Sequence, residues 1–155
     1  MKRGKRTVMA TGVFDIIHPG HIYFLEEAKK LGDELIVVVT RDSVASREKH
    51  PPILPEEARV KIISSLKPVD EACLGYEDDM FRIVEEKRPD VIALGFDQRW
   101  DEEHLKEEFK RRGLEVEVVR LGRDTSDIAG TRKVIEKVVN RFLENSLYRK
   151  REEDK

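Results

Sequence analysis

The chain has 155 residues, enough for one domain with a single hydrophobic core. Hydrophobic residues make up 39% of it and charged residues 40%, and 30 Lys and Arg against 32 Asp and Glu leave a net charge of −2. This balance gives no electrostatic reason to expect nucleic acid or an anionic membrane as a partner, so any anion site must be built locally from a few placed groups.

The N-terminal segment Met1–Arg6 is basic, but the apolar run that follows is only Val8, Met9 and Ala10. This run is too short for a secretory signal, and no stretch approaches the roughly 18 apolar residues of a membrane span. The single cysteine, Cys73, excludes an internal disulfide and a cysteine-rich zinc site. Scarce Asn and Gln beside abundant Glu, Lys and Arg are typical of a thermophilic source. We therefore expect a cytoplasmic, thermophilic protein.

Apolar, β-branched runs alternate with helical patterns along the whole chain. A continuous apolar run such as Leu35–Val39 is expected of a strand that is buried on both faces. The predicted strands are Thr7–Thr11, Glu34–Thr40, Glu71–Leu74, Val91–Leu94 and Glu115–Arg120.

Helical patterns lie between and after these strands. Apolar residues at three-residue spacing indicate the first helix, which Gly32 can end, and Pro55 is a favourable first residue for the second. The predicted helices are Ile22–Leu31, Pro55–Pro68, Asp78–Lys87, Asp101–Arg112 and a last one from about Ser126 or Asp127 to Leu143. Residues 1–145 are thus predicted to form one domain, and the charged residues 146–155 a flexible tail.

The alternation of strand and helix predicts a parallel sheet with helices on both faces. Right-handed crossovers favour a doubly wound, Rossmann-like α/β fold with five strands in the order 3-2-1-4-5. The first and fourth strands are then neighbours where the winding reverses, and ligands bind there, beyond the carboxyl ends of the strands. Two segments are thereby nominated as binding segments, Gly12–His21 and Gly95–Trp100.

The segment Gly12–His21 ends in His18-Pro19-Gly20-His21 at the start of a helix. His18 and His21 are three residues apart and share a face of the first turn, where free N–H groups and the helix dipole favour phosphate. Attack on an α-phosphate creates an anionic transition state that needs such positioned donors. The alternative is that His18 only caps the helix and His21 packs in the core. A zinc site is disfavoured, because zinc-binding pairs usually sit i, i+4 with a third ligand.

Together, Gly12-Val13-Phe14-Asp15 and the His18–His21 segment resemble the cytidylyltransferase-like branch of the HxGH nucleotidyltransferases, over about residues 7–137. The resemblance implies that Gly12, Val13 and Phe14 lie against the nucleotide. It also implies that His18 and His21 act on the phosphates.

In that family, basic residues after the second strand and inside the next helix contact the triphosphate. Lys49 and Arg59 match these positions, so the resemblance implies a catalytic set of His18, His21, Lys49 and Arg59. The alternatives are a solvated loop charge for Lys49 and an ion pair on the helix surface for Arg59.

The family's Gly-x-Asp segment, which helps bind the base, corresponds to Gly95-Phe96-Asp97. The resemblance therefore assigns Asp97 to the nucleotide. Phe96 and Trp100 could stack on a ring or simply pack, and the sequence leaves both possibilities open.

A phosphate-holding Ile-Ser-Ser-Thr-Arg motif opens the last helix of the family and corresponds here to Ile128-Ala129-Gly130-Thr131-Arg132. Both Ser positions differ, but Gly130 still offers its backbone N–H. The resemblance retains Thr131 and Arg132 as nucleotide ligands, and Arg123 is a further phosphate candidate.

The segments Ile53–Glu57 and Ala93–Gln98 look most like those of archaeal FAD synthases. This resemblance implies transfer of AMP from ATP to FMN with a divalent cation, Mg²⁺. The first alternative is a CTP-dependent cytidylyltransferase that acts on glycerol 3-phosphate or another phospho-alcohol, and the second is a non-catalytic nucleotide-binding module. The family also implies a homodimer, and neither nucleic acid nor a membrane is expected as a partner.

Overall fold

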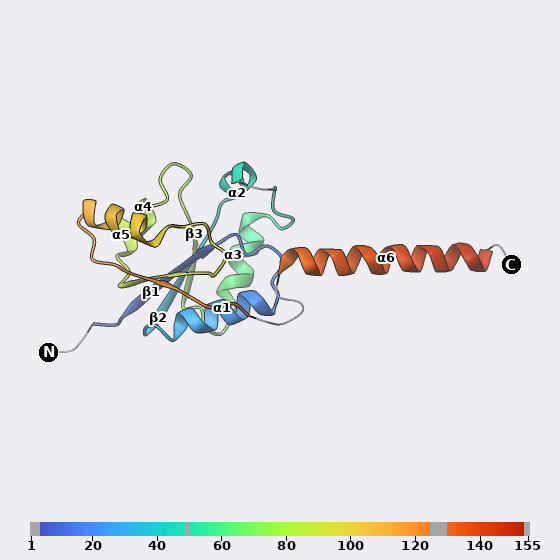
Figure 1. Ribbon diagram of the computed structural model, residues 1–155, viewed down its shortest axis with the longest axis horizontal. Coiled ribbons are helices and arrows are strands. Elements are labelled where there is room, and N and C mark those ends of the chain that lie inside the picture. Colours follow the sequence, from blue (N-terminus) through green and yellow to red (C-terminus); the bar gives the residue numbers. More distant parts are fainter. Residues whose placement is uncertain (1–3, 49, 125–129, 154–155) are drawn as a thin grey trace.

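The computed structural model describes residues 4–48, 50–124 and 130–153. Five parallel strands form one sheet in the order β3-β2-β1-β4-β5, which confirms the predicted doubly wound fold. The strands are β1 (Thr7–Gly12), β2 (Glu34–Val39), β3 (Glu71–Leu74), β4 (Val91–Leu94) and β5 (Glu117–Arg120). Figure 1 shows the sheet crossing the body of the molecule with helices around it.

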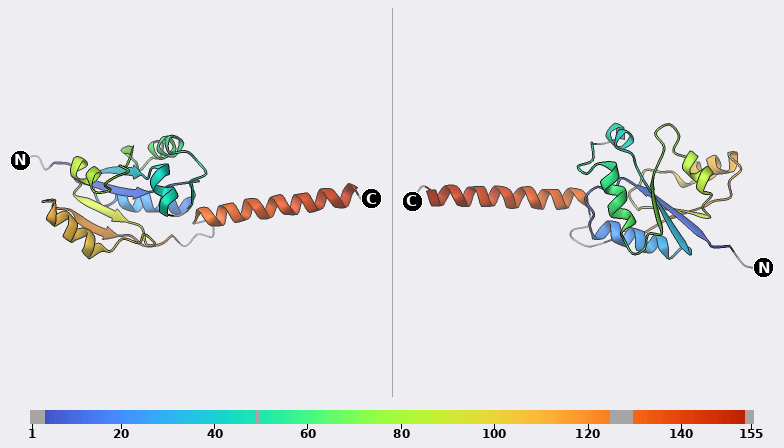
Figure 2. Two further views of the ribbon diagram at one scale, coloured as in Figure 1. Left: turned by 90° about the horizontal axis from the view of Figure 1, so that it is seen from above. Right: turned by 180° about the vertical axis from the view of Figure 1, so that it is seen from behind.

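Helices cover both faces of the sheet because successive strand residues point to opposite sides. Val8 and Ala10 of β1 face one core, together with Leu25 of α1, whereas Met9 faces the other core. The first core lies under α1 (Pro19–Lys29) and α3 (Glu56–Ser64), and the second under α4 (Arg82–Lys87) and α5 (Glu102–Arg111). The two further views in Figure 2 show these layers from above and from behind.

The pairing register brings the carboxyl ends of β1 and β4 together. Ala10 lies opposite Ala93 of β4, and β1 runs on to Gly12, which lies opposite Val39 of β2. The loops that follow β1 and β4 therefore meet at the edge where the winding reverses, as the predicted strand order requires.

Several boundaries differ from the sequence prediction. A short helix, α2 (Asp42–Glu48), follows β2 and was not predicted. The fourth helix begins at Arg82 and not at Asp78, because the Asp79 carboxylate accepts the Phe81 N–H and forms a local turn. The fifth strand begins at Glu117, two residues later than predicted.

The last helix, α6 (Thr131–Glu153), differs most from prediction. It extends ten residues past Leu143, through the segment predicted to be a flexible tail. No Gly or Pro follows Gly130, and the remaining residues are mostly good helix formers, which accounts for the longer helix. The predicted start near Ser126 or Asp127 lies outside the described residues. All three ribbon views show α6 projecting away from the body, and no described helix is long and apolar enough to cross a membrane.

Candidate active site

The loop between β1 and α1 has an unusual backbone. Phe14 has φ 52° and Ile16 has φ 35°, a left-handed region that is costly for a bulky or β-branched residue. Phe14 is nevertheless buried, and a Cβ on Gly12 would come within 2.9 Å of the Phe14 ring. Glycine at position 12 therefore leaves room for the Phe14 ring beneath the loop.

His18 caps the N-terminus of α1 in an extended conformation. Its Nδ1 accepts the backbone N–H of Gly20 at 3.0 Å, and the backbone N–H of His18 is donated to Nδ1 of His21 at 3.4 Å. The two rings stack with their centroids 3.8 Å apart. His18 therefore caps the helix, and the cap uses only Nδ1, so it does not exclude a further role for Nε2.

Both imidazoles are held in one tautomer. A neutral imidazole has one acceptor and one donor nitrogen, so an Nδ1 that accepts a backbone N–H leaves the proton on Nε2. Burial lowers the pKa of His21 to about 4, with a further lowering from the neighbouring His18, and burial also lowers the pKa of His18. At neutral pH the pair therefore presents two uncharged N–H donors and no imidazolium.

The Phe14 ring fixes the position of His21. It meets the His21 ring edge-on with centroids 5.5 Å apart and stacks on Phe24 of α1 at 6.5 Å. The strained loop therefore ends in a packed aromatic support for the second imidazole.

The start of α6 joins the same site. The N–H of Gly130, whose φ of +144° suits glycine, is donated to Nδ1 of His18 at 3.2 Å. The Thr131 hydroxyl is donated to the carbonyl of Asp15 at 3.0 Å. Gly130 thus lies against His18 and Thr131 against Asp15, so both are engaged with protein groups. Arg132 follows with a side chain that is 92% exposed and ion-paired to Glu136.

Arg59 lies inside α3, as predicted, but its side chain is buried. Its side chain is fully buried, and its guanidinium donates to the carbonyls of Leu54, Val13 and Thr40 and to the carboxylate of Asp42. In this conformation Arg59 presents no surface to a triphosphate, and it is not on the helix surface either. Its position instead ties three loops together. Lys49, the other predicted basic residue, lies outside the described residues.

The Asp15 carboxylate performs a related task that the sequence analysis did not assign. Its two oxygens accept the backbone N–H groups of Ile53 at 2.8 Å and Leu54 at 3.0 Å. The loop before α3 is therefore held against the β1–α1 loop from one side by Asp15 and from the other by Arg59. The only signal in the sequence is that Asp15 belongs to the motif at the switch point.

The loop after β4 is shaped by two polar side chains that sequence reasoning also missed. Gln98 accepts the Gly95 N–H and donates to the carbonyl of Thr11, which ties this loop to β1. Arg120 donates to the carbonyls of Gly95, Gln98 and Trp100. The Gln98–Thr11 bond and the Arg120 bonds join segments that are far apart in the sequence, so no local sequence pattern predicts them.

Within that loop the predicted ligand Asp97 is exposed. Trp100 packs against the second core, whereas Phe96 is 49% exposed and its ring lies 5.4 Å from the Arg123 guanidinium carbon. The structure thus separates the two aromatic residues that the sequence could not distinguish. Only Phe96 offers a ring face near the switch point, with Arg123 over it.

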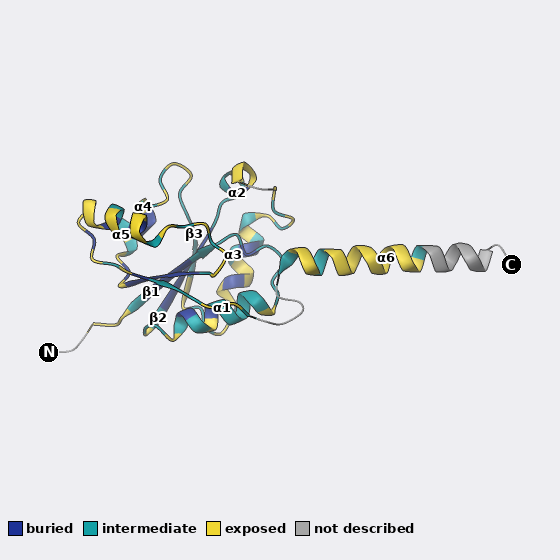
Figure 3. Ribbon diagram, in the orientation of Figure 1, coloured by how far each residue is buried: buried dark blue, intermediate teal, exposed yellow. Residues whose placement is uncertain are grey.

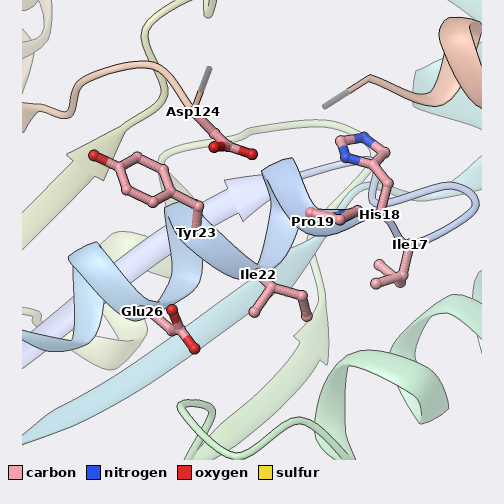
Figure 4. A pocket seen from close by; sticks show the side chains of 7 residues that line it. All are labelled: Ile17, His18, Pro19, Ile22, Tyr23, Glu26 and Asp124. Carbon is pink, nitrogen blue, oxygen red and sulfur yellow. The ribbon is translucent and has the colours of Figure 1, made fainter. Parts of the chain in front are cut away.

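A cavity of about 580 Å³ opens beside the His pair, along α1. Figure 4 shows the Asp124 carboxylate between Tyr23 and His18, above the first turns of this helix. The cavity is lined by Ile17, His18, Pro19, Ile22, Tyr23, Glu26 and Asp124. The carboxylates of Glu26 and Asp124 make it a poor site for a triphosphate. The Asp124 charge also partly opposes the effect of burial, which lowers the pKa of His18. Among the described residues, no group of three or more His, Cys, Asp or Glu could hold a metal ion.

Comparison with known proteins identifies the family. The model of the cytidylyltransferase-like family matches residues 9–151. This chain belongs to that family. The prediction of an HxGH-type nucleotidyltransferase is thereby confirmed.

Among curated relatives, the FAD synthase of Aciduliprofundum boonei is 57% identical over 144 residues, 92% of this chain and 95% of that protein. The FAD synthase of Archaeoglobus fulgidus is 53% identical over 135 residues, 86% of this chain and 98% of that protein. The predicted likeness to archaeal FAD synthases is therefore confirmed.

Solved structures agree on the fold. A Thermoplasma volcanium structure described as a lipopolysaccharide core biosynthesis protein is 51% identical, with a TM-score of 0.77 over 78% of this chain and 99% of that one. A pantoate-beta-alanine ligase from Francisella tularensis, at 15% identity and a TM-score of 0.53 over 81% of this chain and 62% of that one, shares the fold alone.

Proposed function

We propose that the protein is an FMN adenylyltransferase, which transfers AMP from ATP to FMN and releases pyrophosphate. The observation that carries the proposal is the pair of uncharged Nε2–H donors, His18 and His21, at the N-terminus of α1. The choice of ATP and FMN over other substrates is supported by the high identity to FAD synthases over most of the chain.

In the proposed reaction, a phosphate oxygen of FMN attacks the α-phosphorus of ATP in line with the leaving group. The new bond joins the two phosphates, and the bond from the α-phosphorus to the bridging oxygen breaks, so pyrophosphate leaves with that electron pair. The acceptor phosphate has a second pKa near 6 and is largely dianionic at neutral pH, so no general base is required. The protein's task is to stabilise the charge that develops on the α-phosphate oxygens.

The two imidazoles suit that task because their donor direction is set before substrate arrives. Each Nδ1 is occupied by a backbone N–H, and the Phe14 ring supports His21, so neither ring needs to reorganise during the reaction. The dipole of α1 places partial positive charge at the same end of the helix and further favours phosphate there. An uncharged donor also avoids binding ground-state ATP too tightly by simple charge attraction.

ATP is expected to enter as its Mg²⁺ complex. Mg²⁺ is usually held by substrate phosphates and waters with one or two carboxylates.

The remaining ligand assignments are part of this proposal. Arg123 and Arg132 carry exposed guanidinium groups near the switch point, and Lys49 precedes the loop that Asp15 holds. We assign these three basic residues to the phosphates and Asp97 to the base. Arg59 and Thr131 are assigned positioning roles, because their polar groups are hydrogen-bonded to protein.

The cellular location and partners of the enzyme are also part of this proposal. A near-neutral chain that makes a soluble cofactor from two soluble nucleotides is expected in the cytoplasm, without nucleic acid or membrane as a partner. We also propose a homodimer.

The test is a panel in which purified protein and Mg²⁺ are offered ATP or CTP with FMN, riboflavin or glycerol 3-phosphate. Pyrophosphate release and FAD formation are measured separately. We expect both only with ATP and FMN, and no transfer to riboflavin, which lacks the attacking phosphate.

Each other result points to a named alternative. Pyrophosphate release only with CTP and glycerol 3-phosphate would replace the proposal with a cytidylyltransferase. Nucleotide binding without pyrophosphate release for any acceptor would indicate a non-catalytic module. The His18→Ala variant is the matched control, and its pyrophosphate release should fall at least ~100-fold.

A further inference from the structure

The helix α6 exposes an apolar stripe that no other part of the described body covers. Val138 is 64% exposed, Val139 49%, Phe142 70% and Leu143 53%. Figure 3 shows this stretch exposed along the helix after its first turn. Val134 and Ile135, one turn earlier, are half-buried and extend the stripe toward the body. Soluble monomers rarely expose contiguous apolar surface of this kind without a function.

The start of α6 is fixed to the body, so the stripe does not simply fold back. The Gly130 N–H is donated to His18 and the Thr131 hydroxyl to the Asp15 carbonyl. Swinging α6 onto its own body would break these bonds at the proposed catalytic pair. The helix therefore presents its stripe at a distance from the body, where only another molecule can reach it (Figures 1 and 2).

The helix itself gains from a partner. Most helical stability in proteins comes from packing of an apolar face, and isolated helices in water are marginal. A helix of 23 residues with an uncovered apolar face is the case in which pairing adds most.

The spacing of the stripe matches a second copy of itself. The central apolar residues are Ile135, Val138, Val139 and Phe142, whose separations of three, one and three are the same read from either end. In an antiparallel pair centred between Val138 and Val139, Ile135 of one copy faces Phe142 of the other. Val138 of each copy then faces Val139 of the other across the two-fold axis. This self-complementarity is what a two-fold symmetric interface requires.

The exposed apolar area suits a weak dimer. Full burial of an aliphatic side chain removes roughly 100 Å² of apolar surface and that of Phe roughly 200 Å². With the exposed fractions of the stripe, this gives on the order of 300 Å² of apolar surface per copy and on the order of 600 Å² for the pair. Apolar area is about 65% of homodimer interfaces, so the total is about 900 Å², in the range of weak, concentration-dependent association.

We propose that α6 is the dimerisation helix of this protein and that two copies pair their apolar stripes antiparallel, with Ile135 opposite Phe142. The inference names the surface of the proposed homodimer and does not depend on which nucleotide or acceptor the enzyme uses.

Sedimentation equilibrium of the full chain tests the surface. We expect a dimer for the wild type at tens of micromolar and a monomer for Val138→Glu/Phe142→Glu, in which the body around the sheet stays folded because both side chains are exposed on α6. Asn140→Glu, on the opposite face of the same helix, is the matched control and should remain dimeric. A monomeric wild type, or a dimer that survives both substitutions in the stripe, overturns the proposal. The latter result would keep the homodimer but move it to another surface.

Disulfide trapping tests the register. In a Cys73→Ala background, Ile135→Cys and Phe142→Cys proteins are mixed, allowed to exchange and oxidised. An antiparallel pair cross-links the mixture, whereas each variant alone stays uncross-linked because its own cysteines lie about 10 Å apart along the axis. Cross-linking of Ile135→Cys with itself indicates a parallel pair and overturns the antiparallel register. No cross-link in any combination overturns the proposed facing of Ile135 and Phe142.

Discussion

The two loops that meet at the switch point are built in opposite ways. In the β1–α1 loop the polar side chains of Asp15, His18 and His21 are all tied to backbone groups, and the backbone is strained at Phe14 and Ile16. In the loop after β4, the side chains of Gln98 and Arg120 hydrogen-bond to the backbone. Phe96 and Asp97 of the same loop are exposed. The polar side chains on the β1–α1 side of the crevice are therefore fixed by hydrogen bonds before substrate binds. On the β4 side only the backbone is fixed, and side chains such as Phe96 and Asp97 are exposed to solvent.

This difference separates chemistry from recognition. The α-phosphate is common to every nucleotide donor, so the groups that act on it can be locked before binding, as electrostatic catalysis favours. The base and the acceptor vary between enzymes of the same fold, so the groups that read them belong on the side whose surface is exposed. Variants on the two sides should therefore fail in different ways.

The largest effect is expected on the fixed side, at Arg59. Arg59→Ala removes a fully buried guanidinium and leaves three carbonyls and the Asp42 carboxylate without their donor. We expect a loss of about 3 kcal/mol in the free energy of unfolding, measured by urea denaturation.

The conservative variant Arg59→Lys distinguishes positioning from phosphate contact. One ammonium cannot reach all four acceptors, so it should also lose stability. A stable Arg59→Lys protein with a raised KM for ATP would instead restore the phosphate contact that the family resemblance implies. Arg132→Gln, at an exposed position, is the control and should leave stability unchanged.

The next effect concerns the catalytic donor itself. His18→Ala should lower kcat at least ~100-fold, about 2.7 kcal/mol, as loss of a preorganised donor does. His18→Asn separates the two roles of this residue, because Asn is a good N-cap that can accept the Gly20 N–H but has no counterpart of Nε2–H. We expect His18→Asn to be as stable as the wild type and as inactive as His18→Ala. Near-normal turnover in either variant would remove His18 from the mechanism.

The same comparison shows what a sequence can predict. The strand order and the switch point followed from the alternation of apolar runs, because crossover handedness leaves few topologies. The cap position of His18 was only an alternative, because the periodic apolar residues of the first helix begin at Ile22, three residues after the observed start at Pro19. The burial of Arg59 and the bonds of Asp15 depend on three loops meeting in space, so the charge pattern of α3 could only suggest a surface pair or a ligand. The length of α6 was underestimated because composition was weighed above helix propensity.

A pH effect of about 2 kcal/mol should come from His21. Its pKa is about 4 in the folded protein, below the ordinary value of 6.5, so between these values the unfolded chain binds a proton that the folded protein does not. Stability contributed by the neutral His21 is therefore present above pH 6.5 and is lost as the pH falls toward 4. We expect wild-type stability to drop from pH 7 to pH 5.

In His21→Asn, whose side-chain oxygen can still accept the His18 N–H, that drop should be smaller. The exposed His104 on α5 provides the control, and His104→Asn should keep the wild-type pH dependence. An equal drop in the wild type and in His21→Asn would mean that His21 is not buried in its neutral form.

The smallest effect, about 1 kcal/mol, is expected on the open side at Phe96. A base stacked on an aromatic ring contributes roughly 1–3 kcal/mol, so Phe96→Ala should raise one KM about fivefold and leave kcat and stability nearly unchanged. The KM that rises identifies which ring lies on Phe96, that of ATP or that of FMN. Met80→Ala, at an exposed position before α4, is the matched control for loss of surface apolar area. If neither KM changes, Phe96 with Arg123 over it is an ordinary surface contact, and recognition must rest on Asp97 and the backbone that Gln98 and Arg120 hold in place.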